Sequence, residues 1–115
     1  MKKMIHKNKL SNIRCKIDRL DKKLTKILVK RFHYSPQVAK QKWQQGEALL
    51  QLKRLKSLLQ QRKKWAEDLG LSLDFIEKIF YLIHDESLRI QKKAVKEFQK
   101  RSKKLKKIKT KSSKG

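Results

Sequence analysis

The chain is short and strongly basic: 115 residues carry 34 lysines and arginines against 10 acidic residues, a formal net charge of +24. Only 37% of the residues are hydrophobic, with three glycines and one proline, so a single all-α domain with a modest core is expected. The charge favours anionic partners, from small substrates to polyanions, but does not determine the fold.

Three features of the sequence favour a cytoplasmic location. No apolar run is long enough to span a membrane, and the charged N-terminus lacks the apolar segment of a signal peptide. The single cysteine, Cys15, excludes an internal disulfide and fits a reducing compartment. We therefore expect a cytoplasmic protein.

Residues 10–44 are predicted to form one long helix after a basic lead-in over residues 1–9. At about 1.5 Å per residue this helix would be about 50 Å long, more than the rest of one small chain can cover. A second copy of the chain is therefore expected to cover the remainder. Its apolar residues recur at alternating steps of four and three: Ile13, Ile17, Leu20, Leu24 and Ile27.

Cations lie on or beside this apolar stripe. The next step of four falls on Arg31, and burying an unpaired guanidinium there would cost several kcal/mol. Arg14 lies one residue from the stripe near its start, and Lys42 lies near its end. We therefore expect an anion at this face. Pro36 removes one backbone hydrogen bond and predicts a kink near residues 32–35.

Two further helices are predicted, over about residues 48–69 and 73–99. Gly46 suits the turn before the second helix, Gly70 its C-terminal end, and Ser72 the N-cap of the third helix. The helical domain is thus expected to cover residues 10–99. Residues 100–115 contain nine basic residues and no acid, and are expected to form a disordered lysine-rich tail.

Polar residues also interrupt the apolar faces of these two helices. Arg54 lies on the second helix, and Ser87 and Gln91 occupy or flank core positions of the third. Apolar walls with converging cations and an amide are typical of a pocket for a compact polyanion. The histidines show no ligand spacing, and neither a phosphate loop nor a nucleophile–base pair stands out, so we expect no metal and no cofactor.

These residues resemble the all-helical (type II) chorismate mutase family. The resemblance covers about residues 10–95 and needs no insertion. It rests on Ile13-Arg14-x-x-Ile17-Asp18-x-x-Asp21-x-x-Leu24, Arg31, Val38-Ala39-x-x-Lys42, Arg54, Gly70-Leu71, Phe75-Ile76, Ile79-Phe80 and Ser87-x-x-x-Gln91.

The resemblance implies an intertwined homodimer with two active sites that convert chorismate to prephenate. Each site would receive one arginine from the partner, which matches Arg14 here. The other matching positions are Arg31 and Arg54 at the substrate carboxylates, Lys42 and Gln91 at the ether oxygen, and Ser87 as a further polar contact.

Two positions of the substrate site depart from the family. The family usually has a glutamate after the second-helix arginine, which binds the C4 hydroxyl of chorismate, and here that residue is Leu55. An aspartate of many mutases is Gln51 here. The related isochorismate pyruvate lyases, which form salicylate, also have an apolar residue at the first position and resemble the run Arg62-x-x-Trp65-Ala66-Glu67.

Three hypotheses follow from the sequence. The chain is a chorismate mutase, an isochorismate pyruvate lyase (or an enzyme with both activities), or a non-catalytic helical dimer that binds nucleic acid or another polyanion. Ser87 favours the mutase and Leu55 the lyase. The tail over residues 100–115 favours the binding protein, although no recognised nucleic-acid motif supports it.

Overall fold

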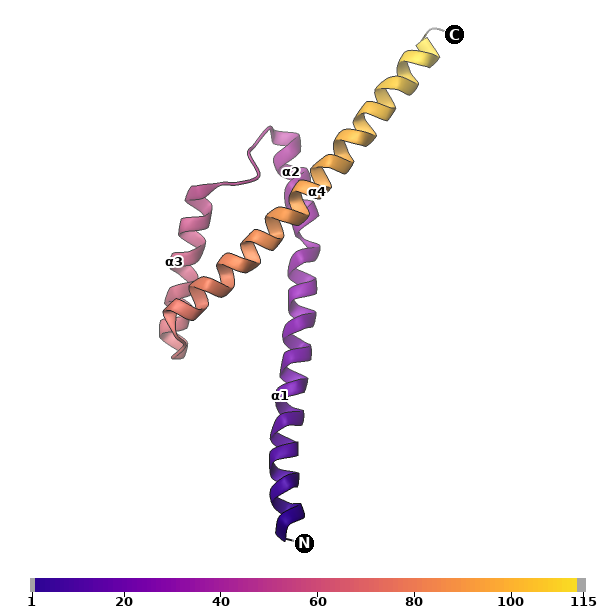
Figure 1. The fold of residues 1–115 in the computed structure, drawn as a ribbon. Coiled ribbons are helices and arrows are strands. Elements are labelled where there is room, and N and C mark those ends of the chain that lie inside the picture. Colours follow the sequence, from indigo (N-terminus) through magenta and orange to yellow (C-terminus); the bar gives the residue numbers. More distant parts are fainter. Residues whose placement is uncertain (1, 114–115) are drawn as a thin grey trace. The chain divides into compact units, whose positions relative to one another are not determined.

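The computed structural model is all-α, as predicted, and describes residues 2–113, with side chains from residue 8 to residue 109. This part of the chain contains four helices and no strand (Figure 1). The chain divides into two compact units, Met1–His33 and Tyr34–Gly115. The helices are α1 (Lys2–His33), α2 (Ser35–Gln45), α3 (Leu52–Leu69) and α4 (Leu73–Ser113).

Helix α1 makes up the first unit. It begins at Lys2, so most of the expected lead-in is part of the helix. The apolar stripe predicted from the sequence is exposed on α1, between 49% for Ile17 and 62% for Leu20. These side chains form a continuous apolar face along α1.

The long helix predicted over residues 10–44 is interrupted at Tyr34, inside the expected stretch. Tyr34 keeps helical dihedral angles (φ −79°, ψ −18°), and Val38 N–H donates to the Tyr34 carbonyl over 2.9 Å. Pro36 has no N–H to donate to the preceding turn, which explains the position of the interruption. A single residue therefore separates α1 from α2.

The connection between α2 and α3 is longer than predicted. Gly46 ends α2 with φ 69°, and Glu47 N–H donates to the Lys42 carbonyl over 2.8 Å. Helix α3 begins at Leu52 instead of near Ala48, because Gln51 has extended dihedral angles (φ −120°, ψ 98°) and serves as its N-cap residue. Residues 47–51 are thus available to line a site.

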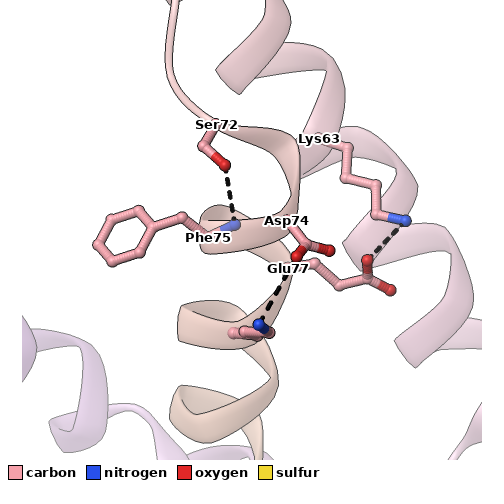
Figure 2. Close-up of polar contacts among 6 residues, drawn as sticks. Lys63, Ser72, Asp74, Phe75 and Glu77 are labelled. Carbon is pink, nitrogen blue, oxygen red and sulfur yellow. Dashed lines mark hydrogen bonds and ion pairs between the residues drawn. The ribbon is translucent and has the colours of Figure 1, made fainter.

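The turn between α3 and α4 follows the predicted capping pattern. Gly70 adopts φ 75°, and Leu71 N–H donates to the Ala66 carbonyl over 2.8 Å. Figure 2 shows the Ser72 hydroxyl accepting from Phe75 N–H (3.3 Å), beside a Lys63–Glu77 ion pair of 2.9 Å that joins the two helices.

In the second unit, α4 packs against both α2 and α3 (Figure 1). The Trp43 and Phe98 rings pack between α2 and α4 with their centres 5.6 Å apart and their planes tilted by 35°. On the α3 side, the Arg62 guanidinium lies 4.5 Å from the centre of the Trp65 ring and 5.6 Å from that of Phe80. Among the described residues, the buried apolar ones are Ala39, Leu58 and Ala66, whereas Leu52 and Trp65 on α3 are 69% and 46% exposed.

Helix α4 continues to Ser113, so the structure differs from the disordered tail expected after residue 99. The stretch from Leu73 to Ser113 contains neither glycine nor proline, and lysine and leucine favour helix, which accounts for the continuation. The expected domain boundary therefore falls inside a helix. Among the described helices, none is both long enough and apolar enough to cross a membrane.

Candidate active site

A chain of hydrogen bonds links α2 to α4 through Lys42. The Lys42 ammonium donates to the Leu49 carbonyl over 2.6 Å and to Gln91 Oε1 over 3.0 Å. Gln91 Nε2 donates to Ser87 Oγ over 3.1 Å, and the Ser87 and Ser35 hydroxyls are 2.7 Å apart. Three residues predicted from the sequence, Lys42, Ser87 and Gln91, are therefore brought together.

Helical spacing explains why these side chains meet. Ser35 and Lys42 lie seven residues apart on α2, with the buried Ala39 between them, and Ser87 and Gln91 lie one turn apart on α4. Ala39 has only a methyl group, which lets the two helices approach closely. Ser35 and Gln91 are only 3% and 6% exposed, and a buried polar group is stable only when it is paired.

The charge of Lys42 is partly desolvated. Burial lowers the pKa of the Lys42 ammonium below its usual 10.5, while the nearby Glu47 carboxylate acts in the opposite direction. The two acceptors that hold the ammonium are uncharged. Among the described residues, the Lys42 ammonium therefore forms hydrogen bonds to neutral oxygens and no ion pair with a carboxylate.

Lys42 also lines a cavity of about 380 Å³. Its volume is in the range of small-molecule sites. Most of the lining side chains come from α2 and the connection that follows it: Tyr34, Gln37, Val38, Gln41, Lys42, Gln45, Glu47 and Gln51.

Gln51 and Glu47 are joined at one side of the cavity. Gln51 Nε2 donates to Glu47 Oε2 over 3.2 Å and to the Ala48 carbonyl over 3.3 Å. Leu55 N–H donates to the Gln51 carbonyl over 3.0 Å, so Leu55 lies one helical turn after Gln51. Leu55 is half-buried, and Arg54 is exposed in the first turn of α3.

The other two predicted site residues belong to the first unit. Arg14 is exposed on α1, and Arg31 is half-buried near its C-terminal end. Arg14 and Arg31 thus belong to a different unit from the group around Lys42.

Sequence reasoning missed three parts of this site: the Ser35 hydroxyl, the Leu49 carbonyl and the Glu47 carboxylate. Ser35 could have been found, because it lies on the same helical face as Ala39 and Lys42. Glu47 and the Leu49 carbonyl belong to the connection after Gly46. The second helix was expected to begin near residue 48, which left almost no connection there. Among the described residues, no group of three or more His, Cys, Asp or Glu side chains could hold a metal ion.

The sequence profile of the chorismate mutase type II family matches residues 13–92, more than half of the chain. This range includes every site residue discussed above. The chain therefore belongs to the chorismate mutase type II family.

Relatives of the chain include longer proteins. A bifunctional chorismate mutase/prephenate dehydratase of Buchnera aphidicola (subsp. Acyrthosiphon pisum) is 32% identical over 91 residues, 79% of this chain and 24% of that protein. The T-protein of Haemophilus influenzae is 36% identical over 78 residues, 68% of this chain and 21% of that protein. The chain thus spans about a quarter of the length of these relatives.

Proposed function

We propose that this domain converts chorismate to prephenate. The observation that carries the proposal is the Lys42 ammonium, which is bonded to the Leu49 carbonyl and the Gln91 amide beside a cavity of small-molecule size. An ammonium has three donors, and these two bonds use two of them. The third is available for a ligand oxygen.

The rearrangement is pericyclic, so the protein supplies orientation and charge stabilisation and needs no nucleophile. As the C–O bond breaks, negative charge grows on the ether oxygen. Lys42 would donate to that oxygen, and the second Nε2 proton of Gln91, whose first bonds Ser87, would do the same. Both interactions strengthen as the charge develops, which favours the transition state over the substrate.

The proposal includes a homodimer in which Arg14 of one chain completes the site of the other. The exposed apolar stripe of α1 supports it. Arg31 and Arg54 would bind the substrate carboxylates, since arginine forms paired hydrogen bonds with carboxylates. A cytoplasmic location belongs to the proposal as well, and the free, exposed thiol of Cys15 fits it.

The first test is to incubate the purified protein with chorismate and follow prephenate. Lys42→Ala should lower kcat by about 100-fold to 1,000-fold, the usual effect of removing one donor to a developing anion. Lys40→Ala is the matched control, because Lys40 is an exposed cation on the same helix. Equal loss in both variants would show that charge in general, and not the Lys42 site, supports the activity.

A lyase activity is the second candidate, favoured by the apolar Leu55 at the start of α3. Incubation with isochorismate, with salicylate as the measured product, separates it from the mutase. Salicylate without prephenate would move the chain to the lyase branch of the fold.

The last part of α4 supports a separate binding function for nucleic acid. The exposed Lys100, Lys103, Lys104 and Lys107 follow helical spacing and share one face. Such a row can neutralise successive phosphates. Deletion of residues 100–115 should then abolish binding of a labelled DNA duplex at low salt and leave prephenate formation unchanged. Retained binding would rule out this function for the tail.

A further inference from the structure

The cavity contains one carboxylate among its lining side chains in the described part of the chain, that of Glu47. Gln51 holds it through the 3.2 Å bond to Oε2. The backbone of Glu47 is fixed as well, because Gly46 ends α2 with φ 69° and Glu47 N–H bonds the Lys42 carbonyl over 2.8 Å. Glu47 is therefore held at the cavity wall through both its side chain and its backbone.

A substrate with a ring hydroxyl requires an acceptor for it in a pocket otherwise rich in donors. Lys42 can only donate, the amides of Gln37, Gln41 and Gln45 offer neutral acceptor oxygens, and the side chain of Leu55 offers none. An unpaired hydroxyl would weaken binding and lower the rate. An ionised carboxylate accepts a stronger hydrogen bond than a neutral amide oxygen does.

The position of Glu47 suits this need. Its partner Gln51 precedes Leu55 by one helical turn, since Leu55 N–H bonds the Gln51 carbonyl. The Glu47 carboxylate, bonded to Gln51, therefore lies beside the N-terminal end of α3, the helix that contains Leu55.

We propose that Glu47 is the acceptor for the ring hydroxyl of the substrate, positioned by Gln51, and that it takes the role for which Leu55 has no polar atom. This inference rests on the proposed mutase function. It makes Glu47 a residue that determines specificity for a hydroxylated cyclic dicarboxylate.

The test compares chorismate with its analogue that lacks the ring hydroxyl, in the full-length chain. Glu47→Gln should lower kcat/KM for chorismate about tenfold to 100-fold and leave that for the deoxy analogue within about twofold. Glu67→Gln, an exposed carboxylate at the end of α3, is the control and should change neither value.

Leu55→Glu provides the second arm. In the Glu47→Gln background it should restore most of the lost kcat/KM for chorismate, because it returns a carboxylate one helical turn after Gln51, which lines the cavity. In the presence of Glu47 its effect should be smaller.

Each other outcome overturns the inference in a distinct way. Equal loss with both substrates would show that Glu47 acts only on Lys42 or on the connection. No loss with either would show that Glu47 is merely solvated. If the unaltered protein rearranges neither substrate, the mutase function itself fails, and the inference fails with it.

Discussion

Lys42 illustrates how one residue can join packing and chemistry. Its ammonium ties the α2–α3 connection to α4 through Leu49 and Gln91, and Lys42 also lines the cavity. The helix–helix contact and the site therefore depend on the same residue. Replacing Lys42 by Met, which keeps length and removes charge, should lower both kcat and the free energy of unfolding, because the Leu49 carbonyl and the buried Gln91 amide oxygen lose their donor.

The pH dependence of activity follows from the lowered pKa of Lys42. Only the protonated ammonium can stabilise negative charge, so kcat should fall as pH rises through that pKa, below the usual 10.5. Glu47 raises this pKa, so Glu47→Gln should move the fall to lower pH. The measurement is kcat against pH, with Lys40→Gln as control. A profile identical in Glu47→Gln and the unaltered protein would contradict this coupling.

The sequence indicated some site residues better than others. Lys42, Ser87 and Gln91 interrupt or flank apolar stripes, and helical periodicity places such residues reliably. Glu47 and the Leu49 carbonyl lie on a connection, where no periodic pattern constrains position. Their role depends on how far α2 extends and where α3 begins, which local preference determines only within a few residues.

At the scale of elements, the α3–α4 turn depends on the left-handed conformation of Gly70. Gly70→Ala should lower the free energy of unfolding by about 1 kcal/mol, because a Cβ strains this backbone conformation. Nothing lies within 4 Å of an added Cβ, so no steric clash contributes. Gly70→Asn should cost less, since asparagine tolerates this region. Urea denaturation measures the free energy of unfolding of both variants. A loss for Gly70→Asn that equals or exceeds the loss for Gly70→Ala would contradict the explanation.

Local helix propensity predicted some helix boundaries correctly and others not. The turn at Gly70 and the cap at Ser72 were predicted correctly, because glycine and serine act locally there. The start of α3 was predicted too early, since Ala48, Leu49 and Leu50 all favour helix. The Leu49 carbonyl of this segment accepts from the Lys42 ammonium, and a side-chain contact of this kind is invisible to helix propensity.

At the scale of the whole molecule, the exposed stripe of α1 predicts concentration-dependent association. Leu24→Glu should weaken the dimer at least tenfold, because an interface that buries a leucine gains about 1.5–3 kcal/mol from it. Lys22→Gln makes the same change in charge on the opposite face of the helix and should leave association unchanged. Sedimentation over a range of concentrations would test this. A monomer at all concentrations would refute the dimer.

The order of the helices along the chain has a consequence for biosynthesis. Helices α2 and α3 both pack against α4, which follows them in the sequence. During translation the earlier two helices therefore leave the ribosome before the element that buries their apolar faces. Their contacts form only after the first turns of α4 have emerged, so a pause in synthesis before Leu73 would prolong exposure to chaperones and proteases.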